Sequence, residues 1–277
     1  HPDVSAAWVT STRARAGAAD ALSDYDVVFA VDVVHLYAAD RAWLSPFGEV
    51  LALYQDPLHD ALGLGFETFG VVAQFASGLH IDFTFWPTAL LRHVVDEGLL
   101  PGDLDDGYRV LFDRQGLAAR LRTPTFQVFL PKRPDAEHFA RWVEEFYSDV
   151  PFVAKQLWRG ELLPARWCLD ADMRQVYLRQ MLEWHAATES GWGKPTGWLG
   201  KGLKSRVAPR FWKALEATFV DARLTSNWQA LFDTLDLFQA AGIEVAERLG
   251  YVYPLSLHER MTAFARRIQS LDGAARD

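Results

Sequence analysis

Two aspartates near the start of the chain have a spacing that could hold a metal ion. Asp24 and Asp26 lie in the stretch SDYDVVFAVDVV, residues 23–34. In a β-strand, residues two apart project to the same side, so both carboxylates should meet at the strand entrance. Carboxylates held close raise each other's pKa unless a cation compensates them, and Mg²⁺ binds such groups together with phosphate oxygens. The pattern therefore favours metal-assisted transfer of a phosphoryl or nucleotidyl group.

The same spacing has an ordinary structural explanation elsewhere in this chain. Asp170 and Asp172 also stand two apart. They precede an amphipathic segment, so we expect them to cap the free N–H groups of a helix start. Spacing alone does not decide between a metal site and a cap.

Two further features support the first pair as a chemical site. Asp82 is the lone acid of the apolar stretch HIDFTFWP, residues 80–87. Burying it would require several donors, so we expect it to join the metal cluster or to act as a base. Ser11 and Thr12 precede the pair in VTSTRARAGAAD, residues 9–20, and hydroxyls in such a turn can hold phosphate oxygens.

The elements that position these residues read as strands in the first half of the chain. Val, Phe and Ile recur between Gly, Pro and Asp, which is typical of short strands. Ser77 and Gly78 predict a hairpin turn, and helices are expected around 43–47 and from Thr88 to a stop at Gly98. The predicted strands are 4–11, 26–34, 49–56, 69–77, 79–87 and 108–114.

The second half of the chain has helical periodicity. Apolar residues recur at spacings of three and four, with an expected break or kink at Pro151 and a stop at Gly191. The proline-containing loop 122–135 predicts the boundary, giving an α/β domain over 1–133 and an all-helical bundle over 134–277. The predicted helical segments are 135–163, 173–191, 210–220, 227–250 and 258–271.

Composition limits the classes of function. A net charge of −8 argues against general nucleic-acid binding and suits a cationic ligand. The single cysteine, Cys168, permits no intrachain disulfide, and its apolar setting predicts inert packing. The sequence has no apolar run long enough for a membrane span and no signal peptide, so we expect a soluble cytoplasmic protein. We also expect a monomer or a weak homodimer. The absence of a starting Met suggests a processed or truncated N-terminus.

Familiar motifs for other chemistries are missing. The Gly-Lys pairs in GWGKPTGWLGKGLKS, residues 191–205, lack the preceding glycine of a Walker loop. The stretch GLGFETFG, residues 63–70, has Thr68 where a dinucleotide fingerprint needs glycine. No Gly-x-Ser-x-Gly elbow occurs, and the eight His show no zinc-ligand spacing.

Taken in order, several segments resemble the aminoglycoside 6-adenylyltransferases, the streptomycin-resistance enzymes. They are SDYDVVFAV, LHIDFTFWP, EEFYSDVPFVAKQLWRGELLPA and YLRQMLEWHAA followed by LGKGLK, and they span nearly the whole chain. The resemblance implies a nucleotidyltransferase-fold α/β domain with a mixed sheet, followed by a helical substrate-binding domain, with the active site in the cleft between them. It also implies transfer of AMP from ATP to a hydroxyl of streptomycin, with Mg²⁺ as cofactor and a cationic aminoglycoside as substrate.

The resemblance also assigns roles to individual residues. Asp24, Asp26 and Asp82 match the metal-binding acids, and Asp82 or Glu145 would take the proton of the acceptor hydroxyl. The other matches are expected to bind ATP or pyrophosphate, although Lys155 and Arg159 could instead pair with Glu161 or Asp149, and Lys201 and Lys204 could simply lie in a flexible loop. These expected nucleotide-binding residues are Ser11, Thr12, Arg13, Lys155, Arg159, Lys201 and Lys204.

One departure from the family pattern leaves a second interpretation open. The family normally has Gly-Ser-Arg where this chain has Ser11, Thr12 and Arg13. Glycine there lets phosphate approach the backbone, so its loss could weaken triphosphate binding. The alternative function is therefore a catalytically inactive or altered nucleotidyltransferase-fold protein that binds a nucleotide or a cationic ligand.

Overall fold

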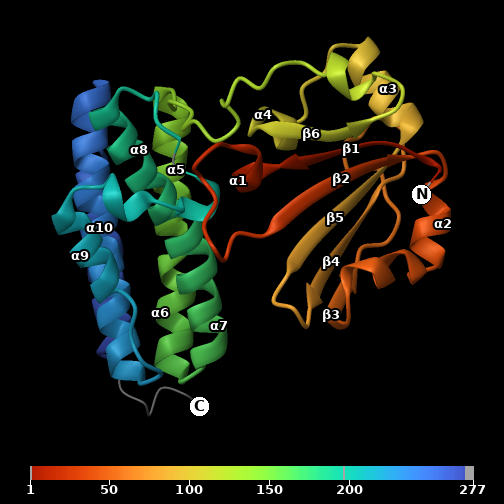
Figure 1. Cartoon of the computed structure of the whole chain (residues 1–277). Coiled ribbons are helices and arrows are strands. Elements are labelled where there is room, and N and C mark those ends of the chain that lie inside the picture. Colours follow the sequence, from red (N-terminus) through yellow and green to blue (C-terminus); the bar gives the residue numbers. More distant parts are fainter. Residues whose placement is uncertain (1, 196, 272–277) are drawn as a thin grey trace. The chain divides into compact units, whose positions relative to one another are not determined.

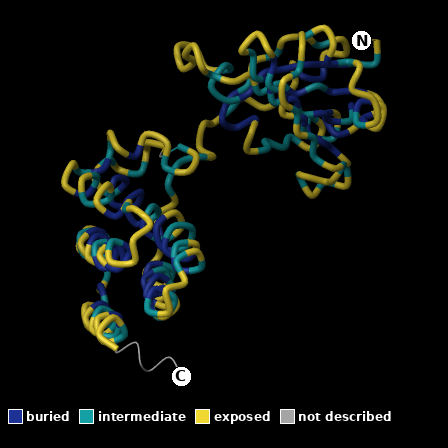
Figure 2. Tube along the Cα trace, turned by 90° about the horizontal axis from the view of Figure 1, so that it is seen from below, coloured by how far each residue is buried: buried dark blue, intermediate teal, exposed yellow. Residues whose placement is uncertain are grey.

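The computed structural model describes residues 2–195 and 197–271 and divides into two compact units, His1–Val128 and Phe129–Asp277 (Figure 1). The first unit is built on a β-sheet, and the described part of the second is helical. Buried residues run through the interior of each unit, so each has its own core (Figure 2). Among the described helices, none is long and apolar enough to cross a membrane.

The first unit holds a mixed six-stranded sheet in the order β3-β4-β5-β2-β1-β6. β2 and β5 pair in parallel at its centre, and the other neighbouring strands pair antiparallel. The strands are β1 (Val4–Thr10), β2 (Tyr25–Val31), β3 (Val50–Gln55), β4 (Phe69–Phe75), β5 (His80–Pro87) and β6 (Tyr108–Asp113). All six predicted strands are therefore confirmed, as is the mixed sheet.

Side-chain alternation gives this sheet two buried faces. Trp8 and Trp86 lie on one face with α3 (Thr88–Asp96), and their rings meet edge to face at 5.4 Å. Phe69 and Phe85 stack on the other face at 4.7 Å, where α2 (Val34–Ala39) and the 3₁₀ helix η1 (Ala42–Phe47) cover them. Because residues of even number on β2 and β5 share the first face, this face also receives any acid placed at those positions.

Turns and boundaries in the first unit follow local chemistry, with one error in the prediction. Gly78, at φ 87°, makes the hairpin turn between β4 and β5, and Gly98, at φ 59°, follows the end of α3. The second strand stops at Val31 rather than at residue 34, because α2 begins at Val34. Its continuous apolar run concealed this change from strand to helix.

The helices of the second unit pack around one core, in which Phe146 and Phe238 stack at 3.6 Å. The predicted break near Pro151 is confirmed, since α5 ends at Ser148 and α6 begins at Val150. Proline in a first helical turn sacrifices no hydrogen bond. The helices are α5 (Ala136–Ser148), α6 (Val150–Arg159), α7 (Leu162–Trp167), the π-helix η3 (Cys168–Leu178), α8 (Arg179–Ser190), α9 (Pro209–Ala217), α10 (Leu224–Leu249) and α11 (Leu255–Gln269).

The predicted helix start at Asp170 and Asp172 is wrong. The chain is already helical from Leu162, and η3 continues it directly into α8. Instead of capping backbone N–H groups, Asp170 forms ion pairs with Arg166 and Arg174. The role of Asp170 in this helix is therefore to form ion pairs with side chains four residues away.

Candidate active site

Asp26 and Asp82 face each other across the central parallel pair of strands. They are register partners on β2 and β5, and their even numbers place both on the face that packs α3. The pKa of Asp26 is raised to about 6, first by burial and then by the negative charges of Asp82, Asp24 and Asp103. Four carboxylates therefore lie near one another at this edge of the sheet, and the other three make ionisation of Asp26 less favourable.

Asp82 is in contact with His80, which is itself held by Gln74. His80 Nε2 lies 3.1 Å from Asp82 Oδ1, and His80 Nδ1 lies 3.0 Å from Gln74 Oε1. The amide of Gln74 is itself oriented, because its Nε2 donates to the carbonyl oxygens of Phe75 and Leu79. Burial raises the pKa of Asp82, and the His80 contact opposes that rise. His80 is a positioning contact that the sequence pattern did not reveal.

Arg13 fixes the segment that carries Asp24. Its guanidinium donates to the carbonyl oxygens of Ser23 and Asp24, and it stacks 3.8 Å from the centroid of the Tyr25 ring. Asp24 itself is exposed just before β2 begins. The resemblance assigns Arg13 to phosphate, but in this structure its visible contacts position the strand entrance.

Ser11 occupies the backbone conformation that glycine would provide. Its φ is 59°, in the left-handed region, and it begins the short helix α1 (Ser11–Ala14) directly after β1. The Ser11 hydroxyl interacts with the Asp26 carboxylate and opposes the rise in its pKa. The turn geometry is therefore retained without glycine, and the added hydroxyl contacts a proposed metal ligand. Thr12, beside it, is partly exposed.

Asp103 is an acid of this site that sequence reasoning missed. It lies on α4 (Gly102–Asp105), in the acidic stretch GDLDDG, and its charge raises the pKa of Asp26. Its neighbours are used structurally: Asp105 accepts from the backbone and hydroxyl of Thr125, and Asp106 pairs with Arg15. The acidic stretch was the available signal, but only the fold shows which of its members faces the sheet edge.

The donor set of the sheet edge fits a hard divalent cation. All its side-chain oxygens come from carboxylates and a hydroxyl, which are ligands that Mg²⁺ prefers. Within residues 2–195 and 197–271, neither Asp24 nor Asp26 forms an ion pair with a basic side chain, although His80 partners Asp82. The repulsion between these acids is what a bound cation would relieve.

The remaining predicted residues belong to the helical unit. Glu145 is partly exposed on α5, and Lys155 and Arg159 are exposed one turn apart on α6. Neither basic residue forms an ion pair within the described chain, so the alternative of pairing with Glu161 or Asp149 is wrong there.

The loop that carries the other two predicted lysines is anchored to its own unit. Lys204 lies 3.6 Å from Glu216 and 5.5 Å from the ring centroid of Trp212, whereas Lys201 is exposed. Gly200 packs against Arg179, which in turn pairs with the buried Glu183. Of the two lysines, Lys201 has the freer side chain for an anionic ligand.

Comparison with known proteins supplies the family. Residues 1–268 match the family model described as Streptomycin adenylyltransferase. The chain belongs to this family. The expected membership is thereby confirmed, and the chain is an adenylyltransferase, that is, a nucleotidyltransferase enzyme.

Two curated relatives agree with this assignment. The chain is 29% identical over 238 residues to the aminoglycoside 6-adenylyltransferase of Bacillus subtilis (strain 168), covering 85% of this chain and 81% of that protein. It is 26% identical over 236 residues to the enzyme of the same name from Campylobacter jejuni, covering 85% and 79%. The crystal structure of an aminoglycoside 6-adenyltransferase from Bacillus subtilis aligns with a TM-score of 0.49 at 22% identity, covering 98% of this chain and 94% of that one.

Proposed function

We propose that this protein transfers AMP from ATP to a hydroxyl of streptomycin or a related aminoglycoside, with Mg²⁺ as cofactor. The observation that carries the proposal is the register pairing of Asp26 with Asp82, with Asp24 adjacent. The relatives named above supply the acceptor class, since both curated proteins are called aminoglycoside 6-adenylyltransferases. The physiological role that follows is antibiotic resistance, exerted in the cytoplasm.

Asp24, Asp26 and Asp82 are the residues that would hold Mg²⁺. When bound, such an ion neutralises charge on the triphosphate and orients it for attack. Arg13 keeps the Asp24 segment fixed through two carbonyl oxygens, and His80 keeps Asp82 oriented. These contacts preorganise the acids before any substrate arrives.

The proton of the acceptor hydroxyl has two candidate bases. Asp82 is partly exposed and burial raises its pKa, which makes it a stronger proton acceptor than an ordinary carboxylate. Glu145 is the second candidate, since it is partly exposed and its side chain forms no ion pair within the described chain. Glu145→Gln separates the two candidates, because replacing the true base should lower kcat far more than it changes KM, whereas Asp82→Asn would also remove a proposed metal ligand.

We assign the phosphate contacts to residues that match the family pattern. Ser11 and Thr12 lie beside the acids, while Lys155, Arg159 and Lys201 are exposed cations of the helical unit. Positive charge near the β- and γ-phosphates would stabilise pyrophosphate as it leaves. We assign Lys204 a smaller share of this role, because Glu216 already partners it.

The deciding experiment is mass spectrometry of streptomycin incubated with the protein, ATP and Mg²⁺. We expect a mass gain of one adenylyl group, which disappears in Asp26→Asn. The matched control is Asp96→Asn, which removes a half-exposed carboxylate of the same unit that pairs with Arg120. An unmodified antibiotic in the presence of folded protein with bound ATP would reject streptomycin as acceptor. A gain that persists in Asp26→Asn would reject the proposed metal site.

A further inference from the structure

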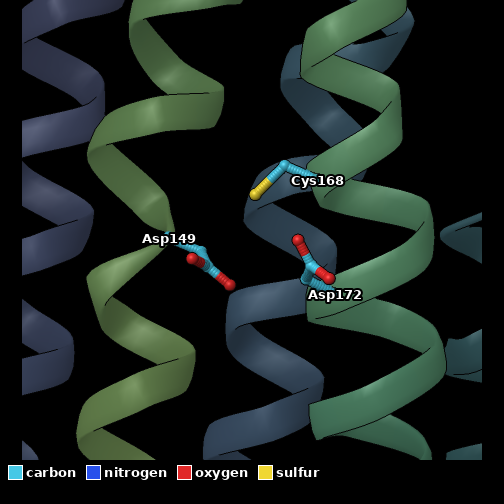
Figure 3. Close-up of side chains that lie close together, drawn as sticks. All are labelled: Asp149, Cys168 and Asp172. Atoms are coloured by element: carbon cyan, nitrogen blue, oxygen red, sulfur yellow. The ribbon is translucent and has the colours of Figure 1, made fainter.

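The helical unit contains a second group of potential metal ligands. Asp149 lies between α5 and α6, Cys168 begins η3, and Asp172 lies one turn further along η3. One ligand atom from each lies within 4.8 Å of the other two. Figure 3 shows the thiol and both carboxylates converging from the two helical segments. The expectation that Cys168 packs inertly overlooked these two acids.

Within the part of the chain that the structure describes, the three side chains lack partners that would explain their position. Cys168 is only 3% exposed, and its thiol forms no hydrogen bond with the described residues. The Oδ2 atom of Asp149 is buried without a hydrogen bond, although its residue precedes α6 and could have capped it. A buried carboxylate oxygen without a donor is costly, so a ligand is the physical remedy.

The arginines on the same helical segment pair with a different acid, Asp170. Asp170, two residues before Asp172, pairs with Arg166 and Arg174. Neither Asp149 nor Asp172 forms an ion pair within residues 2–195 and 197–271. The pKa of Asp149 is raised to about 6, first by burial and then by the negative charges of Asp172 and Glu145. The cluster is an uncompensated negative region that a cation would stabilise.

The π-helix places the ligands on one side. Residues four apart on a helix share a face, so Cys168 and Asp172 both approach the junction that carries Asp149. π-helical segments are rare and recur at functional sites. This segment begins at Cys168 itself, at the point where the thiol turns toward the two acids.

We propose that Asp149, Cys168 and Asp172 bind a thiophilic divalent cation of the Zn²⁺ class. A thiolate with two carboxylates suits Zn²⁺ or Cd²⁺, whereas Mg²⁺ takes oxygen ligands alone. Three protein ligands leave a fourth position for water or for Glu145. Binding forms one metal–sulfur bond, and the proton of the thiol passes to solvent. The sheet-edge acids offer no sulfur, so the two sites differ in chemistry.

The single cysteine makes the test specific. Co²⁺ and Cd²⁺ bound to a thiolate give a ligand-to-metal charge-transfer absorption, and in this chain only Cys168 can produce it. The full-length protein, kept reduced with a non-thiol reductant, is titrated with each metal. We expect the absorption to saturate at one equivalent and to disappear in Cys168→Ser. Asp172→Asn keeps the thiol and should weaken binding by more than about tenfold.

Asp26→Asn is the matched control, because it removes a carboxylate from the other proposed site and should leave the absorption unchanged. Circular dichroism of each variant verifies folding. The proposal is overturned if saturating Co²⁺ and Cd²⁺ give no thiolate absorption in folded wild-type protein. It is equally overturned if Asp149→Asn and Asp172→Asn both bind metal as wild type does. If metal fails to bind while Asp149→Asn weakens streptomycin binding, the cluster serves the cationic substrate instead.

Discussion

Among single residues, Asp26 governs how the metal-free sheet edge responds to pH. Its pKa is about 6 in the folded chain against an ordinary value of 3.8, so the folded state holds this proton more tightly. The free energy of unfolding should therefore fall as pH rises from about 4 to about 6. Without metal, the free energy of unfolding of Asp26→Asn at neutral pH should be higher than that of wild type. The difference should be up to about 2 kcal/mol, after a discount for the exposed part of the carboxyl.

The measurement is urea unfolding in EDTA near both ends of this range. The advantage of Asp26→Asn should shrink toward the acidic end, where wild type is protonated. Saturating Mg²⁺ should reverse the order at neutral pH, because the ion stabilises only a form that binds it. Equal stabilities throughout would show that neither burial nor the neighbouring acids destabilise the ionised Asp26 carboxylate.

Ser11 carries the second single-residue prediction. Its left-handed backbone costs roughly 1–2 kcal/mol for a residue with a Cβ, and glycine avoids this cost but loses about 0.5–1 kcal/mol of chain entropy. Ser11→Ala and Ser11→Gly both remove the hydroxyl that contacts Asp26, so their difference isolates the backbone. We expect the glycine variant to be more stable than the alanine variant by about 1 kcal/mol. Urea unfolding at saturating Mg²⁺ measures the stability difference between the two variants. A more stable alanine variant would contradict the left-handed φ of residue 11.

The site was predictable only where local pattern and family resemblance sufficed. Two-residue periodicity and the lone acid of its strand identified Asp26 and Asp82, and their register then proved to match. His80 and Asp103 were missed because their relation to those acids depends on a hairpin and on a separate short helix. Contacts made through tertiary structure leave no periodic signal in the chain.

The sequence predicts the helices and strands correctly where the periodicity of apolar residues is regular. It fails where the periodicity changes. All six strands and the break before Pro151 follow from residue type and spacing. The helix α2 was hidden inside an apolar run that looked like one long strand. The sequence predicts a new helix start at Asp170 and Asp172, because aspartate commonly caps helices, but both residues lie inside the π-helix η3. Packing against neighbouring helices, which the sequence does not display, keeps that segment continuous.

Gly242 shows how packing constrains α10. A Cβ at this position would lie 2.4 Å from Cε2 of Tyr253, whose hydroxyl meets that of Tyr147 at 2.8 Å. Gly242→Ala gains up to about 1 kcal/mol of helix propensity but incurs about 1–3 kcal/mol of overpacking. We expect a net loss of about 1–2 kcal/mol, seen as a lower Tm. Glu247→Ala, at an exposed site on the same helix, should be near neutral. A Tm for Gly242→Ala at or above wild type would contradict this packing.

For the chain as a whole, the decisive feature is that each unit buries its own core. The largest cluster of buried side chains lies wholly within Phe129–Asp277, and the other two lie within His1–Val128. No cluster of described residues draws on both. A fragment of residues 129–277 should therefore fold alone, with helical circular dichroism and one cooperative thermal transition. A broad, non-cooperative melt would show that the helical unit depends on the sheet.

The same division predicts that neither fragment transfers AMP alone. The proposed metal ligands Asp24, Asp26 and Asp82 belong to the first unit, whereas Glu145 and Lys155 belong to the second. When the two fragments are separate molecules, the groups assigned to the reaction are no longer held together by one chain. Their encounter then becomes intermolecular, and most of the rate advantage of positioning is lost. Mass spectrometry of streptomycin with each fragment, ATP and Mg²⁺ should show no adenylyl gain beside a full-length control. Full activity in residues 1–128 alone would remove the helical unit from the catalytic proposal and leave it a role in substrate choice.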